Sequence, residues 1–147
     1  MILYLDTSAL AKLYLDEEGN NNTPRLSDVI SRYQALTCSV VAYAEARAAF
    51  ARLVRERILT IEQQQTLLRK LNSDWEQYLL IETTHAVIKI AGDLPDRYAL
   101  RGFDAIHLAS AIWLAERVNF PVHFAAYDKR LLDAATQMGM VTIPNSL

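Results

Sequence analysis

The regular alternation of short apolar runs with longer helix-like segments is what most constrains the fold of this chain. The apolar runs lie at residues 2–5, 35–38, 79–81, 122–127 and 140–143. Helix-cap residues and apolar side chains at helical spacing separate one run from the next. Strands joined by helical crossovers run parallel and need helices on both faces. We therefore predict an α/β fold, a single three-layer domain with a mainly parallel sheet.

The expected helices follow from their cap residues. They begin at Thr7 or Ser8, Pro24, Ser39, Thr60, Thr83 or Thr84, Asp104 and Lys129. Thr60 and Gln63 form a capping-box pattern for one helix, and this same helix is expected to loosen at residues 72–74. Pro95 predicts a break or kink, Gly102 separates two helices, and residues 19–24 read as a surface loop.

Composition limits the classes of function. The 147 residues are expected to form one domain, 1–147, and carry a net charge of −2 with a pI near 5.9, so any contact with nucleic acid must be local. The chain has no apolar run of about 18 residues and no signal-peptide pattern, so we expect neither membrane insertion nor export. A single cysteine in an apolar run, Cys38, predicts a buried thiol in the reducing cytoplasm.

Four carboxylates stand where apolar residues would be expected. Asp6 and Asp128 directly follow apolar runs, while Glu45 and Asp104 lie in apolar helical stretches. Burying an uncompensated carboxylate costs several kcal/mol. In parallel sheets, ligands bind at the carboxyl ends of the strands. We predict that the four acids converge there on Mg²⁺ or Mn²⁺, because an all-oxygen site without cysteine suits hard cations better than zinc.

Each acid also has a purely structural interpretation. Helix capping is the alternative for Asp6, Asp104 and Asp128. Glu45 lies in mid-helix between alanines, where its structural alternative is a pair with Arg101 or Arg47.

Four stretches together resemble the PIN domain, and most of all the VapC-type ribonuclease toxins. They are Leu5–Tyr14, the helix around Glu45, Arg101–Ala109 and Tyr127–Leu131. The resemblance spans essentially the full chain, and the order and spacing of the motifs make it specific. It implies a five-stranded sheet in the order 3-2-1-4-5, a Mg²⁺- or Mn²⁺-dependent endoribonuclease, homodimers, and inhibition by a cognate antitoxin.

The resemblance also assigns the acidic site by position, to Asp6, Glu45, Asp104 and Asp128. Many relatives have Thr or Ser two residues before the fourth acid, and this chain has Ala126 there. Asp128 is therefore the least supported member of the set, and Asp133, a helical turn further on, is a poorer substitute.

Phosphodiester hydrolysis explains why these residue types are needed. A carboxylate-held divalent ion lowers the pKa of a water and relieves charge on the phosphoryl oxygens. We assign Asp6 and Asp104 as the primary metal ligands. Glu45 and Asp128 complete the cage or help to deprotonate the attacking water.

Polar residues near the acids are candidates for binding the scissile phosphate. Thr7 and Ser8 stand at a helix start, where backbone N–H groups favour anions, although simple capping explains them equally well. The cationic candidates are Lys12, Arg101 and Arg130. The basic run at residues 52–57 is interpreted as a solvated helix face.

Histidines play a smaller part in this interpretation. His107 lies three residues after Asp104 and shares its helix face, so we expect a packed histidine that supports the site rather than a metal ligand. His85 and His123 belong to no carboxylate cluster and are expected to be structural.

Other functions are separated by specific residues or experiments. A haloacid-dehalogenase-type phosphatase needs a second acid where Ser8 stands, and a receiver domain needs an acceptor where Glu82-Thr83 stands. Two alternatives stay open, an inactive PIN-like binding or regulatory module and a structure-specific DNA nuclease.

Overall fold

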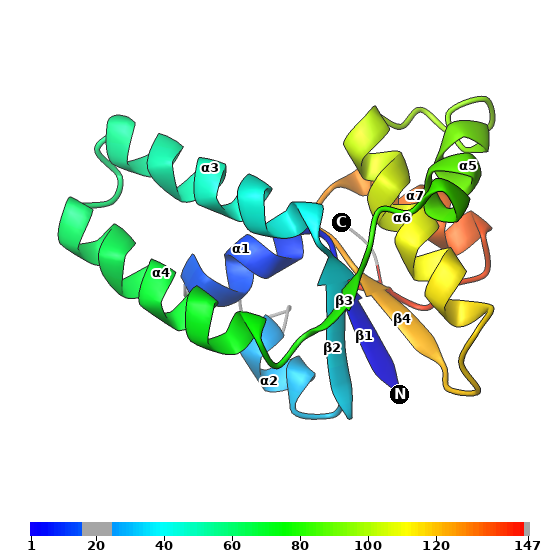
Figure 1. The fold of residues 1–147 in the computed structure, drawn as a ribbon, viewed down its shortest axis with the longest axis horizontal. Helices are drawn as coiled ribbons and strands as arrows, with labels where there is room; N and C mark the ends of the chain where they lie inside the picture. Colours follow the sequence, from blue (N-terminus) through cyan, green and yellow to red (C-terminus); the bar gives the residue numbers. More distant parts are fainter. Residues whose placement is uncertain (16–24, 146–147) are drawn as a thin grey trace.

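The computed structural model describes residues 1–15 and 25–145 and contains one five-stranded sheet (Figure 1). The strands are β1 (Ile2–Leu5), β2 (Ala35–Ser39), β3 (Leu79–Ile81), β4 (Val122–Ala125) and β5 (Thr142–Ile143). Their order is β3-β2-β1-β4-β5, and every neighbouring pair is parallel. The predicted α/β fold and strand order are therefore confirmed.

Helices cover both faces of this sheet. They are α1 (Thr7–Leu15), α2 (Leu26–Ile30), α3 (Val41–Arg55), α4 (Ile61–Trp75), α5 (His85–Asp93), α6 (Gly102–Ala115) and α7 (Lys129–Gln137). Figure 1 shows α1 to α4 on one side of the strands and α5 to α7 on the other. None of the helices within residues 1–15 and 25–145 is long and apolar enough to cross a membrane.

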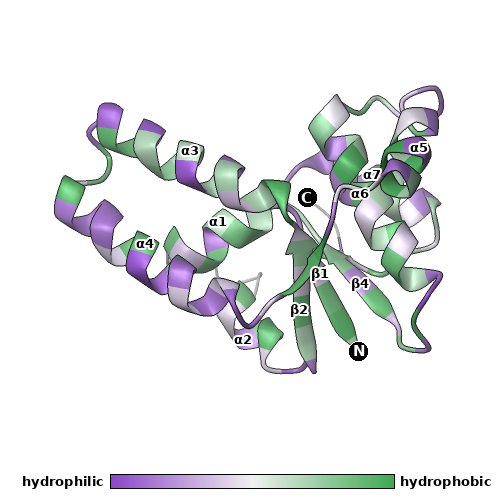
Figure 2. Ribbon diagram, in the orientation of Figure 1, coloured by the Kyte–Doolittle hydropathy of each residue, from purple (hydrophilic) through white to green (hydrophobic). Residues whose placement is uncertain are grey.

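The alternation of side chains along β1 explains the three layers. Leu3 and Leu5 pack into a core with α1, α3 and α4, whereas Ile2 and Tyr4 pack into a second core with α5, α6 and α7. All four side chains are at most 7% exposed. A strand buried on both faces has to be apolar throughout, and Figure 2 shows the strands in green and more purple on the helices.

The central position of β1 creates the edge where the site forms. β1 pairs with β2 on one side and β4 on the other, so the strand order reverses next to it. Leu5 is in register with Ala125, and the Asp6 N–H donates to the Ala125 carbonyl at 3.0 Å. The carboxyl ends of β1 and β4 therefore lie side by side, as a ligand crevice requires.

Several predicted boundaries were wrong by a few residues. Residues 72–74 do not loosen their helix, because α4 continues to Trp75 and the Asp74 Oδ2 accepts hydrogen bonds from Lys70 Nζ at 3.2 Å and Tyr14 Oη at 3.0 Å. Gly102 opens α6 instead of preceding it.

The remaining differences concern element ends. β4 stops at Ala125 rather than at residue 127, and β5 is only Thr142–Ile143. The predicted loop at 19–24 and the helix start at Pro24 lie outside the described residues. α5 ends at Asp93, so Pro95 follows a helix that has already stopped.

Candidate functional site

Asp6 is the buried carboxylate at the carboxyl end of β1. Asp6 is only 5% exposed, and its Oδ1 accepts hydrogen bonds from Ser8 Oγ at 2.7 Å and from the Ala9 N–H at 2.8 Å. The Asp6 carbonyl accepts from the Leu10 N–H at 2.9 Å, so Asp6 is also the cap of α1. Both side-chain bonds use the same oxygen, and the described residues provide no hydrogen bond to Oδ2.

The environment of Asp6 favours its neutral form. Burial raises the pKa of Asp6 from an ordinary 3.8 to about 6, against the opposing effects of the charge of His107 and the hydrogen bonds from Ser8 and Ala9. The charge of Asp104 also raises it. Asp6 and Asp104 therefore interact electrostatically across the end of the sheet, and a cation there would relieve their repulsion.

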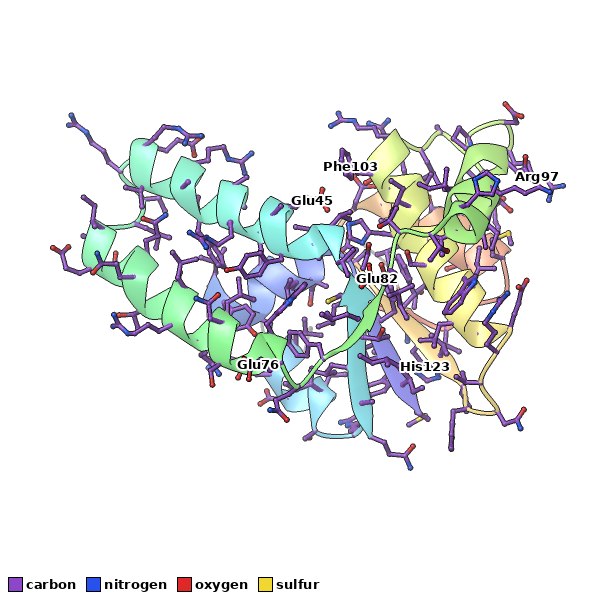
Figure 3. The ribbon with its side chains drawn as sticks, in the orientation of Figure 1. Glu45, Glu76, Glu82, Arg97, Phe103 and His123 are labelled. Atoms are coloured by element: carbon purple, nitrogen blue, oxygen red, sulfur yellow. The ribbon has the colours of Figure 1, made fainter. Side chains whose placement is uncertain are left out.

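Glu45 reaches the same region from α3. Its Oε1 accepts a hydrogen bond from Thr7 Oγ1 at 2.6 Å and pairs with His107 Nε2 at 2.7 Å. Burial raises the pKa of Glu45, but the hydrogen bonds from His107 and Thr7 and the charge of His107 outweigh burial and lower it overall. Glu45 is therefore a carboxylate at neutral pH. Figure 3 shows it near the start of α6, where Phe103 is labelled.

His107 joins Glu45 to the central strand. The His107 side chain is 3% exposed, and its Nδ1 shares a 3.0 Å hydrogen bond with the hydroxyl of Tyr4 on β1. The Tyr4 hydroxyl in turn accepts from the Ser39 N–H at 3.1 Å. The prediction of a packed histidine that supports the site agrees with these contacts.

Asp104 and Asp128 line one polar pocket of about 110 Å³ together with Ala99, Arg101 and Arg130. Asp104 sits in the first turn of α6, where its Oδ2 accepts from the Arg101 N–H at 3.3 Å. Asp128 caps α7 by accepting the Leu131 N–H at 3.0 Å. Both acids thus accept a backbone N–H at the start of a helix, as a purely structural role would also require, and the predicted phosphate-binding residues Arg101 and Arg130 line the same pocket.

The acids do not form a ready-made metal cage. Among the residues that the structure describes, no three Asp, Glu, His or Cys side chains are close enough together to hold an ion. Asp6 and Asp104 instead act on each other electrostatically, and Asp104 and Asp128 share a pocket. The geometry thus offers pairs of carboxylates, with Asp104 common to both pairs.

Ser8 and Lys12, two of the predicted phosphate-binding residues, both lie beside Tyr127. Ser8 Oγ accepts from the Tyr127 N–H at 2.8 Å and donates to Asp6, which ties the segment after β4 to the segment after β1. Lys12 lies on α1 with its Nζ 4.7 Å from the centre of the Tyr127 ring.

The predicted structural partners of Glu45 were wrong. Arg47 donates to the Tyr43 hydroxyl at 3.0 Å, and Glu45 pairs with His107 rather than with Arg47 or Arg101. In the basic run, the Arg52 side chain is 63% exposed and pairs with Glu56, as expected of a solvated face.

Tyr4 is the residue of this site that sequence reasoning missed. It lies within an apolar run, which predicts a core residue, and its aromatic ring is indeed part of the core. A buried tyrosine hydroxyl needs a polar partner, so a tyrosine on an otherwise aliphatic central strand, two residues before Asp6, was the available signal.

Sequence comparisons place these residues in a family. The PIN domain family model matches residues 3–136. Ribonuclease VapC45 from Mycobacterium tuberculosis is 34% identical over 150 residues, covering 99% of this chain and 97% of the relative. Ribonuclease VapC46 from the same species is 32% identical over 145 residues, with 98% of both chains covered.

Solved structures agree in fold. FitAcB from Neisseria gonorrhoeae matches with a TM-score of 0.65 and 19% identity, over 97% of this chain and 96% of that one. A toxin-antitoxin complex from Klebsiella pneumoniae contains a chain that matches with a TM-score of 0.62 and 14% identity, over 99% and 95%. At these identities the likeness concerns the arrangement of the helices and strands.

Proposed function

The chain belongs to the PIN domain family and is similar to its VapC-type members, and we propose that it is a Mg²⁺- or Mn²⁺-dependent endoribonuclease that hydrolyses RNA phosphodiester bonds. The observation that carries this proposal is the buried carboxylate of Asp6, whose pKa is raised by burial and by the charge of Asp104. A buried acid whose ionised form is disfavoured by a second acid at a ligand-binding edge is suited to sharing a cation with it.

The donor set fits a hard divalent ion. Mg²⁺ binds through one or two carboxylates and takes its other ligands from water and substrate phosphates. Asp6 and Asp104 are the pair that would hold it, with Asp128, which lines a pocket together with Asp104, as a further ligand. Once bound, the ion supplies charge relief at the phosphoryl oxygens and a water of lowered pKa.

The remaining side chains divide the work of binding and orientation. Arg101 and Arg130 line the pocket beside Asp104 and Asp128, and we assign them to the phosphates of the RNA backbone. Glu45, ionised at neutral pH, accepts hydrogen bonds and is assigned to orienting the attacking water and receiving its proton.

A role as the toxin of a type II toxin-antitoxin pair completes the proposal. It is supported by the VapC-type relatives and by the toxin-antitoxin complexes among proteins of the same fold. We infer a cognate antitoxin, a homodimer and a cytoplasmic location, where RNA is present and the buried free thiol of Cys38 stays reduced.

Cleavage assays test the reaction class. With Mg²⁺ or Mn²⁺, purified protein is expected to cut single-stranded RNA and to leave branched DNA intact, and EDTA is expected to stop the reaction. Gel electrophoresis of end-labelled substrates measures this. Selective cleavage of branched DNA would identify a structure-specific DNA nuclease, and no cleavage under either ion would identify a binding module.

Metal binding is testable without any substrate. Mn²⁺ at about 100 times its dissociation constant is expected to stabilise the wild type by roughly 2.7 kcal/mol, since the ion binds the folded state. Asp104→Asn should gain clearly less. The matched control is Asp133→Asn, because Asp133 is an acid on α7 that pairs with Lys129 and does not line the pocket. Equal shifts in melting temperature for all three proteins would contradict metal ligation by Asp104.

A further inference from the structure

His107 makes a buried polar connection that helix packing alone does not require. Its ring lies on α6 between the Tyr4 hydroxyl of β1 and the Glu45 carboxylate of α3. Ala105, Leu108 and Ala109 beside it on α6 are apolar and buried, and His107 itself is 2% exposed. A polar side chain placed there costs desolvation energy unless its hydrogen bonds are satisfied.

The hydrogen bond between His107 and Glu45 is fixed in direction. A carboxylate only accepts, so His107 Nε2 must carry the hydrogen that it shares with Glu45 Oε1 at 2.7 Å. The other ring nitrogen is engaged by Tyr4 at 3.0 Å. Flipping the ring would place carbon atoms against both partners, so the pair of contacts sets its orientation.

Tyr4 is itself held from three directions. Its hydroxyl accepts from the Ser39 N–H, and its ring stacks on Phe124 with planes 4° apart. The His107 ring meets the Tyr4 ring edge-on, with 6.1 Å between the two ring centres. Tyr4 is therefore fully buried on the central strand of the sheet and gives His107 a fixed hydrogen-bond partner.

Glu45 lies at the other end of the connection and is less confined. Its side chain is 31% exposed and has three rotatable bonds, but Thr7 and His107 both bind the single oxygen Oε1. The described residues make no hydrogen bond to Oε2. Anchoring one oxygen fixes the rotamer and leaves the second free for a ligand.

We propose that His107 is a positioning residue. Its hydrogen bond with Tyr4 fixes the ring, and the ring holds Glu45 in one rotamer so that Oε2 faces the reacting water. This inference rests on the proposed nuclease function for its catalytic meaning. His107 lies three residues after Asp104, and the proposal is that it acts by orienting Glu45 rather than by binding the metal. Groups that orient a reacting carboxylate in this way typically change activity 10- to 100-fold when removed.

The kinetic test compares replacements at two positions. His107→Leu, which is apolar, should lower kcat by about 10- to 100-fold with little change in KM, because the phosphate contacts are intact. His107→Gln keeps an N–H donor for Glu45 and should recover most of that loss. Tyr4→Phe, which removes the hydroxyl that contacts both His107 and the Ser39 N–H, should have a smaller effect of the same kind. Thr37→Val, which removes the buried hydroxyl bonded to the Leu79 carbonyl, is the control for a lost buried hydrogen bond and should keep kcat.

Crystal structures provide a readout independent of catalysis. Glu45 should occupy one rotamer in the wild type and in His107→Gln, and several in His107→Leu. An ordered, unmoved Glu45 in His107→Leu, or a kcat within twofold of wild type, would overturn the inference. So would a kcat loss that His107→Gln fails to recover. If the wild type cuts no RNA, the proposed function fails, yet the Glu45 rotamers still decide whether His107 anchors it.

Discussion

Asp104→Asn is expected to lower the rate of RNA cleavage by roughly 10³-fold while leaving the metal-free fold as stable as the wild type. A metal site contributes several kcal/mol to the transition state, and each 1.36 kcal/mol is a factor of ten in rate. Asparagine keeps an oxygen for the Arg101 N–H but removes the negative charge that acts on Asp6. Single-turnover cleavage and chemical denaturation in EDTA measure the two effects.

The cleavage rate separates catalysis from capping. If Asp104 only capped α6, asparagine would keep the contact with the Arg101 N–H, and both apo stability and cleavage would stay close to the wild type. Asp133→Asn is the matched control, since it removes an acid from α7 without touching the pocket, and it should change neither quantity appreciably. Wild-type cleavage by Asp104→Asn would remove Asp104 from the site.

The second large effect is a dependence of apo stability on pH that Asp6 imposes. The folded-state pKa of Asp6, about 6, lies above its ordinary 3.8. The folded protein therefore binds the proton more tightly than the unfolded chain, and stability falls as the pH rises from about 4 to about 6. The full loss corresponds to roughly 3 kcal/mol at most.

Asp6→Asn isolates this contribution. Asparagine retains an oxygen to accept the Ser8 and Ala9 hydrogen bonds but carries no charge at any pH. The variant should match the wild type near pH 4 and exceed it by up to roughly 3 kcal/mol above pH 7 in EDTA. Urea denaturation across this pH range measures the difference.

Glu45 provides the internal contrast. Its folded-state pKa is lowered, so its stabilising effect is present above its unfolded pKa and is lost as the pH falls. Comparing wild type with Asp6→Asn cancels that contribution, which both proteins share. A stability difference that stays constant from pH 4 to pH 8 would contradict a raised pKa for Asp6.

The fold was predictable because its signals are local. Each strand of the sheet is a short apolar run, and caps such as Thr60 and Thr84 mark helix starts within three residues of their partners. The order of the strands came from the family resemblance, since periodicity carries no information about which strands are neighbours. The error at residues 72–74 has a tertiary cause, because Tyr14 from α1 supports the end of α4 through Asp74.

The candidate site was predictable only in outline. Asp6 and Asp128 could be placed because they follow strands, and parallel strands share an edge. The partner of Glu45 could not, because His107 is 62 residues away along the chain and meets Glu45 only once α3 and α6 are placed on the sheet. Tyr4, 103 residues from His107, was hidden by an aromatic ring that belongs to the core. Pairings of this kind depend on helix placement, which no local pattern contains.

Three of the acids combine helix capping with a proposed catalytic role, and this combination has an evolutionary consequence. Asp6, Asp104 and Asp128 each support the first turn of a helix through an oxygen, and asparagine also has a side-chain oxygen. Under the proposed function, replacing one carboxylate oxygen by an NH2 group at any of these positions would abolish cleavage and spare the fold. Such an inactive copy would keep the surface that the inferred antitoxin recognises, and by binding that antitoxin it would leave active copies uninhibited.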